Sequence, residues 1–196
     1  MSSTKQNTRE RILEATWQLM VQHNGQGVRM TDIAKHIGIS RQALYLHFES
    51  RTELMIATTH HVDDVLGLDE RLKYFHTLTD GRELLEEYVN VWGNYIPKIY
   101  GIGKVLIQMK DTDKDAAAAW NDRMTELRNG CEKVISVLVE DRKLSTKWSS
   151  QKDAVDIFWT ILSLHNWEQL TTECGWSESE YITKMKLLLI SSFVIN

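Results

Sequence analysis

The stretch TDIAKHIGISRQALYLHFES, residues 31–50, contains two short amphipathic segments separated by one glycine. In the first segment, isoleucine and alanine side chains recur on one side of a helix, and in the second, Leu44 and Phe48 lie four residues apart on one face. Gly38 lies where the chain must turn sharply, so we expect it at positive φ. The spacing predicts two short helices joined by a tight turn.

Each of these helices has a candidate N-cap. Thr31 is predicted to cap a helix that ends at Ile37, and Ser40 to cap one that ends at Phe48. With Leu44 and Phe48 facing inward, several side chains on the second helix point outward. They are Arg41, Gln42, Tyr45, Leu46 and His47. This is the helix-turn-helix arrangement, in which the second helix enters the major groove of DNA.

Further helices are predicted on both sides of this motif. A first helix over Thr8 to His23 is expected to end at NGQG, residues 24–27. Ser50 and Glu53 form the reciprocal capping pattern that starts a helix, and this one is expected to run to about Leu66.

The segment VRMTDIAKHIGISRQALYLHFESRTELM, residues 28–55, closely resembles the DNA-binding domain of the TetR family of transcriptional regulators. The resemblance covers roughly residues 8–56. It implies a homodimer that binds a palindromic operator, usually as a repressor, and a helical C-terminal domain that binds a small effector. It also implies DNA contacts from Thr31, Ser40, Arg41, Gln42, Tyr45, His47 and Arg51.

Two positions depart from the family pattern. Arg51 stands where the family usually has lysine, and its charge is expected to keep a phosphate contact. Leu46 stands where the family often has a polar or aromatic residue, and we expect it to touch a thymine methyl group. Among the polar contacts, the Gln42 amide can pair with adenine at two points, so Gln42 is expected to specify a base.

Composition and charge indicate how the whole chain is organised. Its 196 residues are 42% hydrophobic and 26% charged, which is ordinary for a globular protein. Residues 1–51 carry a net charge of +3, and residues 52–196 carry −7. We therefore expect a DNA-binding domain at 1–51 and an effector-binding and dimerisation domain at 52–196. With no cleavable leader and no apolar run of membrane-spanning length, a cytoplasmic location is expected.

Apolar residues recur at helical spacing almost everywhere, so the fold class is predicted as all-α, with about nine helices. After a mixed connection at 67–80, helices are expected over 81–100, 102–110, 113–142, 151–173 and 178–194. GIG at 101–103 is interpreted as a helix break, and Ser177 with Glu180 as a second capping box.

Two C-terminal segments are more apolar than one core face requires. They lie at 154–164 and 182–194, within the helices expected at 151–173 and 178–194. A homodimer in which these helices form a four-helix bundle would cover both apolar faces. Its two-fold axis would place the two recognition helices about one turn of DNA apart, ~34 Å.

Aromatic and methionine side chains are candidates for an effector pocket between helices, which favours an apolar or aromatic effector. The same side chains could instead belong to the core and the dimer contact. The candidates are Tyr88, Trp92, Tyr95, Met109, Trp120, Met124, Trp159 and His165. We expect effector binding to act through the helix from Thr52 to Leu66, by changing the spacing of the recognition helices.

Other kinds of site are disfavoured. DTDKDAAAAWND at 111–122 imitates a calcium loop but lacks its glycine and its glutamate, so an acidic helix start is preferred. His60, His61 and Asp64 have no defined further ligand, and no metal or cofactor is expected. No nucleophile context is present beyond Ser163 and His165 near Trp159, so we do not expect an enzyme. The alternative to an effector-controlled repressor is a DNA-bound protein of this fold that recruits a protein partner.

Overall fold

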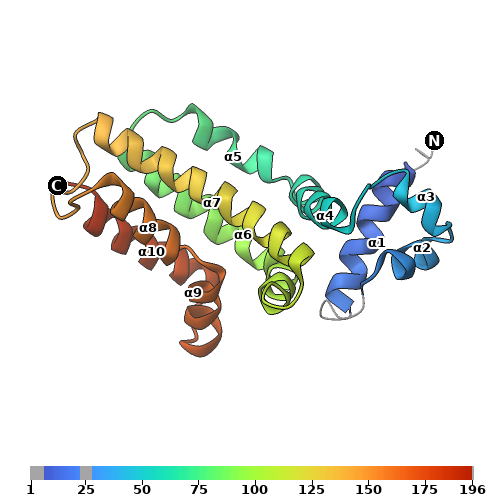
Figure 1. Cartoon of the computed structure of the whole chain (residues 1–196). Helices are drawn as coiled ribbons and strands as arrows, with labels where there is room; N and C mark the ends of the chain where they lie inside the picture. The colour runs from blue at the N-terminus through green and yellow to red at the C-terminus, as the bar shows by residue number, and fades with distance from the viewer. Residues whose placement is uncertain (1–6, 23–27, 196) are drawn as a thin grey trace, which may run out of the picture. The chain divides into compact units, whose positions relative to one another are not determined.

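The computed structural model describes residues 7–22 and 28–195. These residues form ten α-helices and one π-helical turn, and they contain no β-strand beyond an isolated bridge between Leu144 and Val194 (Figure 1). The all-α prediction is confirmed. The chain divides into two compact units, one made of residues 1–67 and 101–123 and the other of 68–100 and 124–196.

The first unit is built on four helices from the N-terminal part of the chain, α1 (Thr8–Gln22), α2 (Met30–Ile37), α3 (Arg41–Tyr45) and α4 (Arg51–Leu66). α1 packs against both α2 and α4, and its buried side chains include Ile12 and Met20. The unit also contains the last turns of α6 (Gly81–Met109) and the first turns of α7 (Lys114–Glu140). The predicted end of the first helix at residues 24–27 lies outside the described residues.

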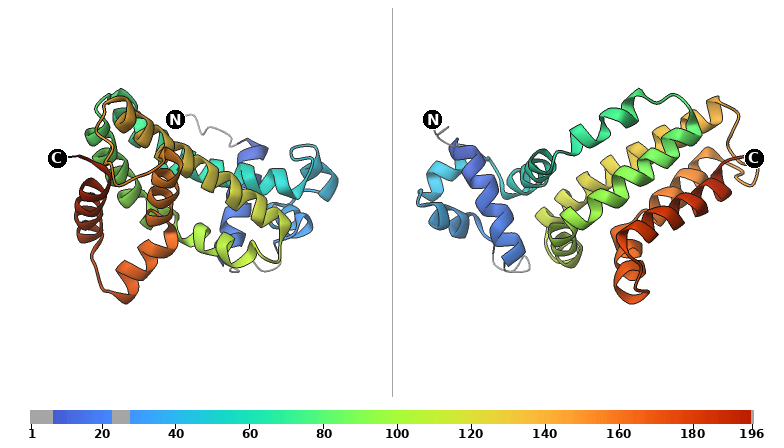
Figure 2. Two further views of the ribbon diagram at one scale, coloured as in Figure 1. Left: turned by 60° about the vertical axis from the view of Figure 1, so that its left-hand side comes forward. Right: turned by 180° about the vertical axis from the view of Figure 1, so that it is seen from behind.

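The second unit contains α5 (Leu68–Thr77), most of α6 and α7, α8 (Gln151–Ile161), α9 (Leu164–Glu168), the π-helical turn η1 (Gln169–Glu173) and α10 (Glu178–Phe193). Figure 2 shows α6, α7, α8 and α10 beside one another. Side-chain contacts join them: Tyr88 of α6 reaches Leu127 of α7 and Phe158 of α8, and Phe158 packs on Phe193 of α10. The core of this unit is therefore a four-helix bundle.

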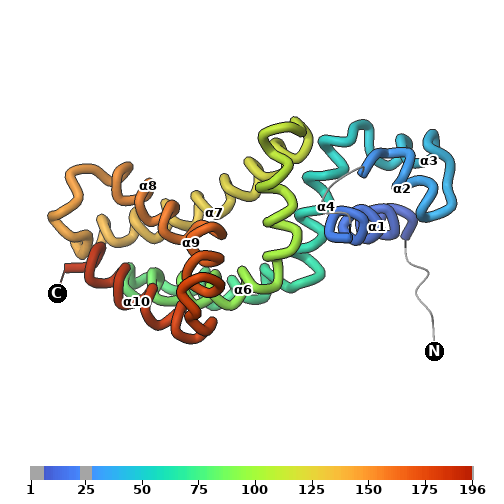
Figure 3. The backbone as a smooth tube through the Cα atoms, turned by 90° about the horizontal axis from the view of Figure 1, so that it is seen from below, coloured from blue at the N-terminus to red at the C-terminus, as the bar shows by residue number. Residues whose placement is uncertain are grey.

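Two predicted interruptions are wrong, because the structure is helical there. The connection expected at 67–80 contains α5: Gly67, at φ 68°, ends α4, and a new helix begins at once and buries Phe75. The break expected at GIG, residues 101–103, is absent, since α6 continues to Met109. Ile102, Val105 and Leu106 are buried there, and their packing outweighs the low helix propensity of glycine. Figure 3 follows the backbone from α6 into α7.

The single helix predicted at 151–173 is also wrong. α8 ends at Ile161, and Ser163 caps α9 by accepting a hydrogen bond from the Asn166 N–H at 3.2 Å. The indole N–H of Trp92 donates to the carbonyl of Leu162 at 2.6 Å, so a carbonyl that the break frees is satisfied from α6. The predicted capping box at Ser177 and Glu180 is confirmed at the start of α10.

Candidate nucleic-acid interface

The helix-turn-helix forms through local hydrogen bonds. Gly38 has φ 72°, as expected, and the N–H of Ile39 donates to the Ala34 carbonyl at 3.0 Å across the turn. Ser40 caps α3 by accepting from the Ala43 N–H at 3.0 Å. Leu44 and Phe48 are fully buried, which confirms the inward face. α3 proper is shorter than predicted and ends at Tyr45, after which the chain turns.

The start of α2 differs from the prediction for Thr31. The helix begins at Met30, with Arg29 as the N-cap residue, so Thr31 lies in its first turn. The reason is that the Asp32 carboxylate accepts from the Arg29 N–H at 3.2 Å, and a side chain three residues on therefore satisfies the helix end. Thr31 is still solvent-exposed.

An exposed set of six side chains belongs to the helix-turn-helix, one in the first turn of α2 and five between the N-cap and the C-cap of α3. We call it the recognition surface, and it consists of Thr31, Ser40, Arg41, Gln42, Tyr45 and Leu46. The Arg41 guanidinium lies 5.4 Å from the centroid of the Tyr45 ring, and its Nη2 is 3.4 Å from the phenol oxygen. Leu46 is 87% exposed. His47 lies at the edge of this surface, half-buried.

Two arginines of α1 make contacts that stabilise the helix-turn-helix, and neither was identified from the sequence. Arg11 donates to the Ile37 carbonyl at the end of α2 at 2.9 Å. The Arg9 guanidinium lies over the Phe48 ring at 4.7 Å. A cation at a helix C-terminus and a cation over an aromatic face are both stabilising. These contacts attach α1 to the end of α2 and to Phe48, which follows α3.

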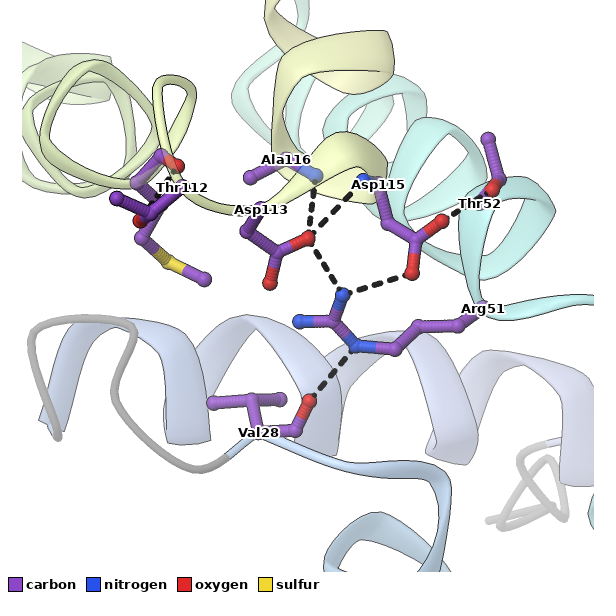
Figure 4. A network of polar contacts seen from close by, with 8 residues as sticks. Val28, Arg51, Thr52, Thr112, Asp113, Asp115 and Ala116 are labelled. Atoms are coloured by element: carbon purple, nitrogen blue, oxygen red, sulfur yellow. Dashed lines mark hydrogen bonds and ion pairs between the residues drawn. The ribbon is translucent and has the colours of Figure 1, made fainter.

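Arg51, the remaining predicted DNA contact, is placed differently. Its Nε donates to the Val28 carbonyl at 2.9 Å, and its Nη1 donates to Asp113 at 2.8 Å and to Asp115 at 2.9 Å (Figure 4). The hydroxyl of Thr52 donates to the second carboxylate oxygen of Asp115. We call this group, Val28, Arg51, Thr52, Asp113 and Asp115, the clasp.

Asp113 has two roles in the clasp. Its Oδ1 accepts from the backbone N–H groups of Asp115 and Ala116 at 3.0 and 3.2 Å, and it therefore caps α7 as well as pairing with Arg51. Burial raises the pKa of Asp113, but the Arg51 guanidinium and these N–H groups outweigh it, and the pKa lies below its usual value. The acidic helix start predicted for 111–122 is confirmed, and its partner is an arginine more than sixty residues away.

The start of α4 shows only half of the capping box expected there. Ser50 accepts from the Glu53 N–H at 3.1 Å, as predicted. The Glu53 carboxylate, however, accepts from the N–H of Glu49 at 2.7 Å. Both bonds satisfy N–H groups near the helix start, so α4 begins firmly at Arg51.

A second ion pair joins α4 to α7, and in this one the arginine belongs to α7 and the aspartate to α4. Here the arginine, Arg123, comes from α7, and it pairs with Asp63 of α4. Arg123 also bonds Asp122 at 2.7 Å and lies within 3.0 Å of the His60 ring nitrogens. α4 is therefore held to the first turns of α7 near both of its ends, within the first unit.

The predicted pocket residues fall into both units. Met109 and Trp120 belong to the first unit, and the other six belong to the second. In the second unit, Tyr88 donates to the Leu127 carbonyl and Tyr95 is buried in the bundle, whereas His165 is exposed. Met109, Trp92, Trp120, Met124 and Trp159 are half-buried. The structure thus uses some of these side chains in the core, which was the alternative considered from the sequence.

Three buried polar atoms of the second unit have no hydrogen-bond partner among the described residues: the indole nitrogens of Trp159 and Trp167 and the phenol oxygen of Tyr181. Tyr181 lies in a fully buried position, and burial raises its pKa. Trp167 and Tyr181 were not predicted as pocket residues. An unpaired buried donor is costly, and such donors are candidates for bonds to a ligand.

A cleft of about 810 Å³ opens between α1 and α4 in the first unit. Charged and apolar side chains share its walls: Arg9, Glu10, His60, His61 and Asp64 line it together with Leu13, Ala57 and Val65. None of the predicted pocket residues lines this cleft, so it is not the aromatic pocket expected from the sequence.

Comparison with known proteins agrees with this geometry. Residues 12–58 match the family model described as bacterial regulatory proteins, tetR family. This range begins in α1 and ends within α4, so it contains the complete helix-turn-helix. No helix in the described part of the chain is long and apolar enough to cross a membrane.

The curated relatives match over part of the chain. Nucleoid occlusion factor SlmA from Pectobacterium carotovorum is 37% identical over 65 residues, and SlmA from Edwardsiella ictaluri is 35% identical over 65 residues. In both cases the match spans 33% of this chain and 33% of the relative. The chain thus shares about a third of the length of these relatives.

Solved structures match over nearly the whole chain. A transcriptional regulator from Saccharomonospora viridis, in complex with choline, has a TM-score of 0.72 at 18% identity and covers 96% of this chain and 98% of its own. The fatty acid degradation regulator FadR from Bacillus halodurans scores 0.66 at 18% identity, covering 95% and 96%. A TetR transcription regulator from Haloarcula marismortui scores 0.67 at 14% identity, covering 95% and 98%. At such identities these matches show a shared fold.

Proposed function

We propose that the protein is a cytoplasmic transcriptional repressor, because residues 12–58 match the tetR-family model and nearly the whole chain shares the fold of solved transcriptional regulators. It binds a palindromic operator as a homodimer and leaves it when a small effector binds. The observation that carries this proposal is the recognition surface, where Arg41, Gln42 and Tyr45 are exposed on the second helix of a helix-turn-helix. Donors of this kind, on that helix, are suited to base edges and phosphates in a major groove.

Dimerisation is supported by exposed apolar side chains on α8 and α10. Leu187 is 65% exposed and Leu188 is 46% exposed on α10, and Ile157 is exposed on α8. These positions lie in the two segments that were too apolar for one core face. A second copy that packs α8 and α10 against the same helices would bury them, and it would supply the second recognition helix that a palindrome requires.

The effector is proposed to be a small, largely apolar or aromatic molecule bound in the second unit. Support comes from the aromatic side chains of the bundle and from the unpaired donors of Trp167 and Tyr181, which a ligand oxygen could satisfy. Among proteins of this fold, one was solved in complex with choline, a small organic cation, and another is described as a regulator of fatty acid degradation. Neither name identifies the effector of this chain.

Control of DNA binding requires that the effector bind one state of the dimer better than the other. A difference of ~1–3 kcal/mol would weaken operator binding about 5- to 150-fold. α4 is the helix through which we expect this effect to pass, because it follows the recognition motif directly and is held to α7 at both ends.

The test begins with selection of duplexes from a random pool by the purified protein. Wild-type protein is expected to enrich a palindrome, and fluorescence anisotropy should show one dimer per duplex. Candidate ligands are then screened by thermal shift and added to the complex. A ligand that raises the melting temperature but leaves operator affinity unchanged at every concentration has no regulatory role, and failure of every stabilising ligand would favour partner recruitment instead.

A further inference from the structure

The clasp joins three elements through one guanidinium group. Val28 lies two residues before α2, Arg51 is the first residue of α4, and Asp113 caps α7. The fork of an arginine can donate to a carbonyl and to two carboxylates at once, whereas a lysine offers a single point charge. The segment that leads into the helix-turn-helix is thereby tied to the turn between α6 and α7.

The hydrogen bonds and burial of the clasp oppose movement of Arg51 from the carboxylates to a DNA phosphate. The side chains of Arg51, Asp113 and Asp115 are only 20%, 24% and 14% exposed. If the guanidinium moved to a DNA phosphate, it would leave three hydrogen bonds and two partly buried carboxylates without their cation. Removing one member of a buried ion pair lowers stability more than removing both, because it leaves the other charge buried and unpaired.

We propose that Asp113 and Asp115 are positioning residues for operator binding. They hold Arg51 against the Val28 carbonyl, and so set the direction in which α2 and α3 leave the body of the first unit. Arg51 is committed to this clasp instead of to a DNA phosphate, which replaces the phosphate contact expected from the sequence. The inference rests on the proposed function, because it concerns how the same surface reaches an operator.

If Asp113 and Asp115 acted only through their charge, neutralising them would change DNA affinity in the opposite direction. Negative charges on a DNA-binding unit repel the phosphate backbone, so their neutralisation should tighten binding to any duplex. A positioning role predicts weaker binding, and only to the operator, because specific contacts depend on orientation while non-specific binding depends on charge. The direction of the change therefore separates the two roles.

The first experiment uses the double variant Asp113→Asn/Asp115→Asn and two probes: the duplex selected by the wild-type protein and a duplex of scrambled sequence. Asparagine at 113 keeps the N-cap of α7, so charge is removed without loss of the cap. The matched control is Asp111→Asn, which removes one negative charge from an exposed neighbour outside the clasp. We expect the double variant to bind the selected duplex about tenfold more weakly. Its binding to the scrambled duplex should be unchanged or slightly tighter, because two negative charges are removed. Asp111→Asn should bind the selected duplex at least as tightly as the wild type.

The second experiment changes Arg51 and measures binding across a salt series. Arg51→Lys keeps the charge, so it would preserve a phosphate contact but not the clasp; we expect it to bind the selected duplex as weakly as Arg51→Ala. The salt slope of Arg51→Ala should equal that of the wild type, since no phosphate contact is lost. Combining Arg51→Ala with the two asparagine substitutions should add no further loss, because all three changes remove the same interaction.

Several outcomes would overturn this role. They are unchanged or tighter binding of the asparagine variant to the selected duplex, equal losses on both duplexes, full activity of Arg51→Lys, and a salt slope of Arg51→Ala reduced by about one per protomer. Each leaves the repressor proposal standing, because the wild-type protein still selects a sequence. A wild-type protein that enriches no sequence refutes the proposed function, and the positioning role falls with it.

Discussion

The surfaces proposed for contact in the two units differ in the side chains that they expose. The first presents arginine, glutamine and tyrosine on a short helix with a firm cap, whereas the second exposes leucine and isoleucine on α8 and α10. Exposed polar donors on a helix suit a hydrated, charged partner, and a group of exposed aliphatic side chains suits another protein surface. The difference indicates that DNA contacts and the contact between protomers are made by separate parts of the chain.

The largest effect is expected from a charge placed among the exposed aliphatic residues. Leu188→Glu should split the dimer, because a carboxylate cannot be buried there without a partner, and operator binding should fall by about a hundredfold as the two half-sites are no longer linked. Light scattering and anisotropy measure the two effects. Val139→Glu is the control, since Val139 is 42% exposed on α7 and Leu188 is 46% exposed. A wild-type protein that is monomeric at micromolar concentration would contradict the dimer.

A smaller and more local effect is expected on the recognition surface. Gln42→Ala should cost ~1–3 kcal/mol per half-site on the operator and relax the preference at one base position, since an amide that pairs with a base edge is removed. Selection from random duplexes measures the preference directly. Gln18→Ala removes the same amide from α1, where it bonds Glu14, and should leave base preference intact. Unchanged preference in Gln42→Ala would mean that the recognition surface is misplaced.

Two serine caps allow structure and DNA contact to be separated within the first unit. Ser40 caps α3 and Ser50 caps α4, with nearly equal distances of 3.0 and 3.1 Å to the N–H groups they accept. Ser40→Ala and Ser50→Ala should each lower the free energy of unfolding by ~1 kcal/mol in urea titrations. Only Ser40→Ala should also weaken DNA binding at temperatures where both proteins are folded. If the two variants bind DNA with equal affinity, Ser40 does not contact DNA.

The smallest effect is expected from acid on the clasp. The pKa of Asp113 is lowered in the folded chain, so its contribution to stability is present above its ordinary value of 3.8 and is lost as the pH falls through the lower folded value. Urea titrations between neutral pH and about pH 3 should show a shallower loss for Asp113→Asn than for the wild type. Identical pH profiles would show that the Arg51 pair does not stabilise the fold.

The sequence determined those features that depend on residues close together in the chain. The helix-turn-helix, the positive φ of Gly38, the cap at Ser40 and the capping box at Ser177 all arise from side chains within a few residues of the groups they bond. Their geometry follows from backbone preferences, which do not depend on the rest of the fold. The same locality made the family resemblance visible in a quarter of the chain.

Tertiary structure decided everything that required distant residues to meet. The glycines at 101 and 103 favour a break, but burial of their neighbours keeps α6 continuous, and the carbonyl at the end of α8 is satisfied by Trp92 from another helix. Arg51 looked like an exposed cation at a helix start until its partners from α7 were known. A side chain of arginine can reach either a phosphate or a carboxylate, and its choice depends on which group the fold brings within about 3 Å.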